Sequence, residues 1–194
     1  MITRNEQNGF TIVELLIVIV VIGILAAIVI VAYNGISTQA NNTAKINELK
    51  SLQKLFEAHK ALNGKYPQDQ LTSGRYCLST GFPNAGSPGV PSCYLTNITT
   101  NSIYSYPEND ATAVAIRDDL STVGKVPAPV IKHSANSVMG PIALYYPTAI
   151  YLITVIKGET INDCPSGTIR TYPADQAALD SQNGRLECSI ALTK

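Results

Sequence analysis

The stretch Gly9-Phe10-Thr11-Ile12-Val13-Glu14-Leu15 joins a short polar leader to an apolar run that continues to Val31. Between Phe10 and Tyr33 nearly all side chains are aliphatic or aromatic, and Glu14 is the one charged residue. A helix of about 24 residues is about 36 Å long, which is enough to cross a hydrocarbon core of roughly 30 Å. The sequence therefore predicts a membrane-spanning helix with a carboxylate near its start.

This segment does not fit a secretory signal well, and a plain membrane anchor, although possible, leaves Glu14 without a role. A secretory signal has an apolar core of about 7 to 15 residues before a small-residue cleavage site, whereas here the apolar run continues through Ala26-Ala27. A plain anchor has no use for a carboxylate, which is costly to place in lipid, so Glu14 is expected to have a partner. If the chain is cut after Gly9, the new amine on Phe10 of a neighbouring copy would carry the opposite charge.

The residues Gly9 to Leu16 resemble the processing and N-methylation site of type IV pilins and pseudopilins. The resemblance is close over about residues 7–35 and continues loosely through the following helix. It implies that residues 1–9 are a prepilin leader peptide, which a prepilin peptidase removes by cutting after Gly9. It also implies N-methylation of Phe10, and it places the family's assembly glutamate at Glu14.

Two features depart from the family pattern. Many type IV pilins have a proline well inside this helix, where the filament form is often unwound, but this chain has no proline before Pro67. Gly23 is then the intrinsic weak point, worth about 1 kcal/mol against Ala. The leader has one Arg and one Glu, so its positive character rests on Arg4 and the amino terminus. This is a weak signal for retention on the cytoplasmic side, although it has the expected sign.

Past Tyr33 the apolar continuity ends, but helical spacing continues. Apolar positions recur at threes and fours, opposite a charged set, which is typical of an amphipathic helix. The apolar set is Ile46, Leu49, Leu52, Leu55, Phe56, His59 and Leu62, and the charged set is Lys45, Glu48, Lys50, Lys54, Glu57 and Lys60. We expect one helix from about Phe10 to Leu62, ended by Asn63-Gly64. Residues 10–33 would be the transmembrane and filament-core part, and residues 34–64 an amphipathic stalk.

Residues 65–194 are expected to form an extracellular globular head. Residues 68–107 are rich in Gly, Pro, Ser, Thr and Asn, which predicts a loop. Residues 108–123 read as a short helix that is capped by Asn109 or Asp110 and ended by Gly124. Asp118-Asp119 is expected on its solvated face.

The C-terminal part of the head, about residues 142–193, reads as a sheet. Residues 145–156 are apolar on both alternations, which suits a central strand covered on two sides. Leu186, Cys188, Ile190 and Leu192 alternate with Glu187, Ser189, Ala191 and Thr193, which predicts one buried and one wet face. Residues 168–172 are a candidate for a further short strand. The predicted fold class is α+β, with a long N-terminal helix packed on an antiparallel sheet as in type IV pilins.

The four cysteines all follow the apolar segment and are even in number, as expected for disulfides in an oxidising compartment. Three pairings are possible, and we favour the local one, which joins Cys77 to Cys93 and Cys164 to Cys188. The closed loops of about 16 and 24 residues would each contribute about 3 kcal/mol. A zinc site is disfavoured because no Cys-x-x-Cys pair exists and only His59 and His133 stand elsewhere.

The composition and motifs argue against an enzyme and against nucleic-acid binding. The chain balances 14 basic against 14 acidic residues, so it has no electrostatic footprint for nucleic acid. It has no Gly-x-Ser-x-Gly, no His-Glu-x-x-His and no phosphate-binding Gly-rich loop. His59 is expected to pack on the helix and His133 to lie in a loop. We therefore expect no catalytic residue, no metal and no cofactor.

The resemblance implies a structural subunit of a type IV pilus-like filament, held in the cytoplasmic membrane before assembly and on the cell surface afterwards. Its partners would be membrane lipid before assembly, the prepilin peptidase, a membrane platform protein, a motor ATPase and other pilin subunits, as a homopolymer. One alternative is a minor pilin or a pseudopilin of a type II secretion or DNA-uptake system. A second is a membrane-anchored surface binding domain that never polymerises. The choice among adhesion, motility, secretion and DNA uptake stays open.

Overall fold

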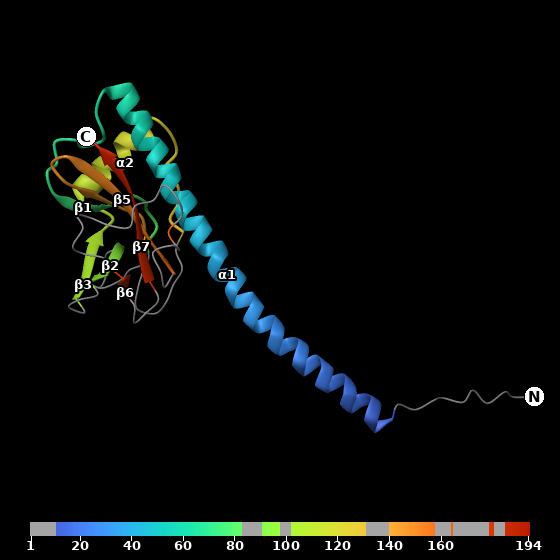
Figure 1. Ribbon diagram of the computed structural model, residues 1–194. Coiled ribbons are helices and arrows are strands. Elements are labelled where there is room, and N and C mark those ends of the chain that lie inside the picture. Colours follow the sequence, from blue (N-terminus) through green and yellow to red (C-terminus); the bar gives the residue numbers. More distant parts are fainter. Residues whose placement is uncertain are drawn as a thin grey trace, which may run out of the picture. The chain divides into compact units, whose positions relative to one another are not determined.

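The computed structural model describes residues 11–82, 91–97, 102–130, 140–157, 164, 179–180 and 185–194. Gly9 and Phe10, the predicted cleavage site, therefore lie outside the described residues. The chain divides into two compact units, residues 1–40 and 41–194. One helix, α1 (Ile12–Asn63), runs through the boundary between them (Figure 1).

From Ile12 to Tyr33, and apart from Glu14, α1 is apolar around its whole circumference. The large side chains of this part are roughly half exposed or more, for example Leu16 at 52% and Ile30 at 62%. A helix that is apolar all round is suited to lipid or to the interior of a bundle rather than to water. By length and composition, α1 is able to cross a membrane.

The end of α1 follows from two adjacent residues. Gly64 has a φ of +74°, a left-handed conformation that glycine adopts without strain, and its N–H donates to the carbonyl of Lys60 at 2.8 Å. The side-chain amide of Asn63 donates to the carbonyl of His59 at 3.1 Å. Two carbonyls of the last turn are thereby satisfied, and the chain leaves the helix.

The second unit contains a five-stranded antiparallel sheet in the order β1-β4-β5-β7-β6. Its strands are β1 (Gly74–Cys77), β4 (Ile142–Tyr145), β5 (Ala149–Lys157), β7 (Arg185–Thr193) and β6 (Leu179–Asp180). A separate two-stranded ribbon is formed by β2 (Ser92–Asn97) and β3 (Ser102–Pro107). This architecture confirms the predicted α+β class with a long N-terminal helix and an antiparallel sheet.

One face of the sheet packs on the second half of α1 and on α2 (Ala111–Ser121). The register places Ile150 opposite Leu192 and Leu152 opposite Ile190, so all four side chains point to the same face. The residues that α1 and α2 bury in this core are Leu49, Leu52, Phe56, Ile116 and Leu120. The amphipathic stripe predicted from the sequence is therefore the side of α1 that covers the sheet.

The opposite face of the sheet is also covered. Cys77, Ile142 and Val155 pack there with Phe82 and with Cys93 of β2. Glu187 and Ser189 point to this face, and they are only 8% and 4% exposed. The prediction of a wet face on β7 is therefore wrong at Glu187 and Ser189, because a second layer lies on that side of the sheet, whereas Thr193 at the end of the strand is exposed as predicted.

The segment 68–107, predicted as a loop, contains β1, β2 and β3. Its many turn-forming residues gave no sign of these strands, and only β1 has its pairing partner outside the segment. β1 pairs with β4, which is more than 60 residues away in the sequence. β2 and β3 pair with each other, with Ser92 opposite Pro107.

The predicted strand over residues 145–156 is in fact the end of β4, a turn and most of β5. Pro147 stands in the turn, where the N–H of Tyr146 donates to the carbonyl of Ala149 at 2.9 Å. Proline has no N–H for a ladder, so the chain reverses there instead of continuing. The candidate strand over residues 168–172 lies outside the described residues.

Helix α2 is shorter than the predicted 108–123. Its N-cap is Asp110, whose Oδ1 accepts from the N–H groups of Thr112 and Ala113 at 2.9 and 3.1 Å. These two bonds satisfy donors that have no partner inside the helix. Of the two caps predicted, Asp110 is the one used.

Candidate functional site

Thr11 and Glu14 form hydrogen bonds with each other at the N-terminal end of α1. Thr11 precedes the first helical residue, and its carbonyl accepts from the N–H of Leu15 at 3.3 Å. Glu14 Oε2 accepts from the N–H of Thr11 at 2.8 Å and from its Oγ1 at 2.7 Å. In return, Thr11 Oγ1 is 3.2 Å from the N–H of Glu14. This reciprocal arrangement is a capping box.

The capping box leaves part of the carboxylate available. Both bonds from Thr11 go to Oε2, and Glu14 Oε1 accepts no hydrogen bond from the described residues. The surrounding side chains of this helix turn are exposed aliphatic groups such as Ile12, Val13 and Leu15. The site is thus an anion with a fixed orientation on an apolar surface, a fitting counterpart for a single positive group in a lipid-like environment.

From the sequence we identified Glu14 by its charge, but we did not identify Thr11 as its hydrogen-bonding partner. The signal is nevertheless present, because Thr-x-x-Glu before an apolar run is the usual sequence signature of a capping box. Gly9 and Phe10, the other two residues of the predicted processing site, lie outside the described residues.

A second set of contacts joins α1 to β5 near the point where α1 enters the second unit. β4 pairs with β5 only as far as Ile153, so residues 154–157 of β5 extend beyond it. The side-chain amide of Asn42 donates to the carbonyl of Lys157 at 2.6 Å and accepts from its N–H at 3.0 Å. Asn42 therefore replaces a neighbouring strand at this position.

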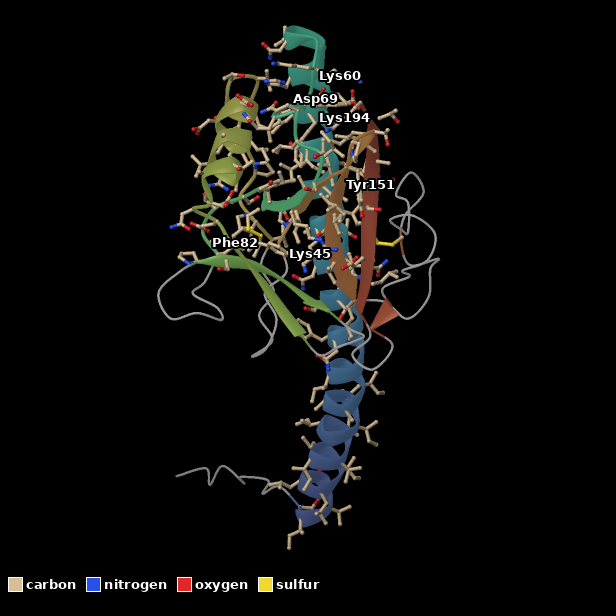
Figure 2. All side chains as sticks on the ribbon, turned by 90° about the vertical axis from the view of Figure 1, so that its left-hand side faces the viewer. Lys45, Lys60, Asp69, Phe82, Tyr151 and Lys194 are labelled. Atoms are coloured by element: carbon tan, nitrogen blue, oxygen red, sulfur yellow. A yellow bond between two sulfur atoms is a disulfide. The ribbon has the colours of Figure 1, made fainter. Side chains whose placement is uncertain are left out.

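Lys45 continues this pairing one helical turn later. Its ammonium donates to the carbonyl of Val155 at 2.8 Å, and the side chain is 9% exposed. Figure 2 shows Lys45 on the part of α1 that faces the sheet. Lys45 was predicted on the solvated face of the helix, and the structure corrects this, because a carbonyl beyond the end of β4 needs a donor.

Glu48 is a second correction to the predicted solvated face. It is 5% exposed, and its carboxylate accepts from the N–H of Val130 at 3.1 Å and from Ser79 Oγ at 3.3 Å. Burial raises the pKa of Glu48 to about 7, although these two bonds and the charge of Lys45 act in the opposite direction. Glu48 thus ties two loops of the head to the helix.

Glu187 is the other buried carboxylate of the head. It lies on β7 opposite Val155, on the face of the sheet away from α1. Burial raises the pKa of Glu187 to about 7, and Arg75 opposes this shift only in part. Both carboxylates therefore change charge near neutral pH.

The four cysteines form two disulfides, Cys77–Cys93 and Cys164–Cys188, with Cα–Cα distances of 5.9 and 5.7 Å. This is the local pairing that we favoured from the sequence. The first bond joins β1 to the β2–β3 ribbon, and the second joins residue 164 to β7. His59 is 6% exposed, and its Nδ1 lies 2.9 Å from the carbonyl of Lys65, so it packs at the end of α1.

Comparison with known proteins finds similarity over about a third of the chain or less. The family model described as "Prokaryotic N-terminal methylation motif" matches residues 4–30. The chain is 34% identical over 67 residues to type II secretion system core protein G of Pseudomonas aeruginosa, which is 34% of this chain and 47% of that protein. It is 32% identical over 63 residues to the protein of the same name of Escherichia coli, covering 32% of this chain and 43% of that protein.

A fimbrial protein is similar in the same way. Fimbrial protein Q of Moraxella bovis is 41% identical over 64 residues, which is 33% of this chain and 40% of the relative. The chain thus spans less than half the length of each of these relatives. No solved structure matches the chain significantly.

Proposed function

We propose that this chain is a structural subunit of a pilus-like filament of the type IV pilin and pseudopilin family, because its N-terminal segment matches the methylation motif and it is similar to a secretion core protein and a fimbrial protein. The observation that carries the proposal is the capped carboxylate of Glu14 at the start of an exposed apolar helix. Such a helix is stable only in lipid or against other helices. The carboxylate then needs a positive partner in either setting.

In this proposal, cleavage after Gly9 supplies that partner. The new amine of Phe10 lies about one helical turn from Glu14, and N-methylation retains its positive charge. The amine of a neighbouring subunit binds Glu14 Oε1, while Thr11 holds Oε2. Neutralising the carboxylate in the apolar bundle couples processing to assembly, because the uncut chain has no amine at this position.

Before assembly the apolar half of α1 is held in the cytoplasmic membrane, and afterwards it forms the core of the filament. The chain contributes no catalysis of its own. The prepilin peptidase, the membrane platform protein and the motor ATPase are separate chains that act on it. The head, fixed to α1 through Asn42, Lys45 and Glu48, is carried on the surface of the filament.

A second candidate is a pseudopilin of a type II secretion system. It is favoured by the relatives named type II secretion system core protein G, whereas fimbrial protein Q favours a pilus. The two functions use the same assembly chemistry and differ in the machine that the filament serves. Deleting the gene in its host and measuring secreted protein and surface filaments in parallel distinguishes them.

The assembly proposal is tested by Glu14→Gln and Glu14→Ala in the native host. Both variants are expected to remain in the membrane at normal amounts and to give few or no filaments in the fraction sheared from cells. Asp118→Asn is the matched control, because Asp118 is an exposed carboxylate of the head. Normal filaments from both Glu14 variants would reject the proposal and favour a membrane-anchored surface domain that does not polymerise.

A further inference from the structure

A polar pocket of about 290 Å³ lies in the head where α1 ends and α2 ends beside it. It is contained wholly in the second unit and is not part of the assembly site. The residues that the argument uses are His59 and Asn63 of α1, Lys65, Gln68 and Gln70 of the following turn, and Asp119 of α2. Nothing in the proposed function uses this pocket.

The turn that forms one wall of the pocket is held by hydrogen bonds from Lys194 and Tyr145 to its backbone carbonyls. The ammonium of Lys194 donates to the carbonyls of Asp69 and Leu71 at 2.7 and 2.5 Å, and the hydroxyl of Tyr145 donates to the carbonyl of Pro67 at 2.8 Å. Figure 2 shows Asp69 and Lys194 together at this end of the head. A wall held by three such bonds is preorganised for a ligand.

Gln68 is strained in a way that directs its side chain along this wall. Its φ is +47°, and among the described residues it is the one non-glycine with a positive φ. Glycine or asparagine adopts this conformation more easily. The amide of Gln68 donates to Asp119 Oδ2 at 3.0 Å, and its oxygen accepts from Gln70 Nε2 at 2.8 Å. Such strain at a pocket wall points to a function for the side chain.

The pocket offers several hydrogen-bonding groups that the described part of the chain leaves unused. His59 Nδ1 lies 2.9 Å from the carbonyl of Lys65, which can only accept, so Nδ1 carries a proton. Asp119 Oδ1 and Gln70 Oε1 accept no hydrogen bond from the described residues. The ammonium group of Lys65 donates no hydrogen bond to any described residue. Donors and acceptors are therefore both present, with one positive and one negative charge.

We propose that this pocket binds one neutral sugar residue, as a free monosaccharide or as the terminal unit of a glycan. A ring with several hydroxyl groups both donates to the free oxygens and accepts from the amide and ammonium groups. A net anion would be repelled by Asp119 and a net cation by Lys65, so a ligand without net charge fits the charge pattern best. The volume is near the lower limit of roughly 300 Å³ for ligand pockets, which suits one ring rather than an oligosaccharide.

The test uses the ¹⁵N-labelled full chain in micelles of a polyoxyethylene detergent, which contains no sugar. Galactose, glucose, mannose and N-acetylglucosamine are titrated separately. Glycine, a zwitterion, and inorganic phosphate, an anion, serve as the comparison probes. We expect at least one sugar to shift the NMR signals of Gln68 and Gln70 with a Kd in the millimolar range. The micelle contains no filament, so the result is independent of the assembly proposal.

Two variants and one control make the test specific. Asp119→Ala is expected to weaken sugar binding at least tenfold, and Asp118→Ala, its neighbour on the exposed face, is expected to leave binding unchanged. Gln68→Gly is expected to lose binding while the melting temperature stays the same or rises, because glycine fits the positive φ. The proposal is overturned if no sugar shifts the pocket signals, if only glycine or phosphate does, or if Asp119→Ala binds as the wild type does.

Discussion

Thr11 and Glu14 satisfy each other's backbone at the start of α1. Glu14 Oε2 accepts from the N–H of Thr11 at 2.8 Å, and Thr11 Oγ1 accepts from the N–H of Glu14 at 3.2 Å. The pair begins the helix and orients the carboxylate at the same time. A preset anion of this kind reduces the ordering that a partner's amine would otherwise have to impose.

Thr11→Val should weaken this arrangement without changing the shape of the side chain much. The valine has no hydroxyl to donate to Glu14 or to accept from its N–H, and loss of an N-cap costs about 1 kcal/mol of helix stability. We expect fewer filaments than in the wild type but more than in Glu14→Ala, with Thr11→Ser close to the wild type. The sheared filament fraction measures this. Equal yields from Thr11→Val and the wild type would contradict a role for the cap.

Asn42→Ala should loosen the end of β5 from α1. The substitution removes both hydrogen bonds to Lys157, which are partly exposed and worth about 1 kcal/mol in total. Hydrogen exchange at the amide of Lys157 is expected to become faster, while the centre of β5 keeps its protection. Asn47→Ala, on an exposed position of the same helix, is the control. Unchanged exchange at Lys157 in Asn42→Ala would show that the pair does not hold the strand.

The buried carboxylates predict that the head is less stable at alkaline than at acidic pH. The pKa of Glu187 is raised by burial from about 4.5 to about 7 in the folded state, so between these values the folded chain binds more protons than the unfolded chain. The stabilising contribution is therefore complete below about pH 4.5 and is lost as the pH rises through 7. Glu48 acts in the same direction.

Glu187→Gln should remove part of this pH dependence, because the amide stays neutral. At pH 8 the variant is expected to be more stable than the wild type by up to about 3 kcal/mol, and at pH 4 the two should be similar. Urea unfolding followed by tyrosine circular dichroism measures the difference, with Asp118→Asn as an exposed control. Parallel stability curves for the wild type and Glu187→Gln from pH 4 to pH 8 would contradict the raised pKa.

Removing the first disulfide should destabilise the attachment of the β2–β3 ribbon. Cys77 and Cys93 are fully buried, and their bond closes a loop of sequence separation 16, which is worth about 3 kcal/mol. The double variant Cys77→Ala/Cys93→Ala is expected to have a lower melting temperature and faster proteolysis near residues 92–107. A melting temperature equal to that of the wild type would show that packing alone holds the ribbon.

Local signals in the sequence were sufficient for the helices. Asn63-Gly64 predicted the end of α1, and the apolar spacing of Leu49, Leu52 and Phe56 predicted the side that packs on the sheet. The break between β4 and β5 could also have been predicted, because Pro147 cannot continue a central strand. These features depend on residues that are neighbours in the sequence.

Several features that depend on individual distant residues were not predicted. Lys45 and Glu48 lie on the charged side of the helical repeat, yet both are buried, because Val155 and Val130 supply their partners from 110 and 82 residues away. Glu187 lies at a position where the alternation of polar and apolar residues predicts exposure to solvent. The alternation does not reveal that a second layer covers this face of the sheet. Periodicity identifies one packed face of an element, and it says nothing about a second layer.

The most direct measurement is the intact mass and N-terminal sequence of the protein purified from its native envelope. A chain that starts at N-methylated Phe10 is the predicted result, and it would establish that Glu14 stands one helical turn from a new amine. A chain that keeps Met1, or one that is cut beyond Ala27, would contradict processing at Gly9 and with it the proposed assembly through Glu14.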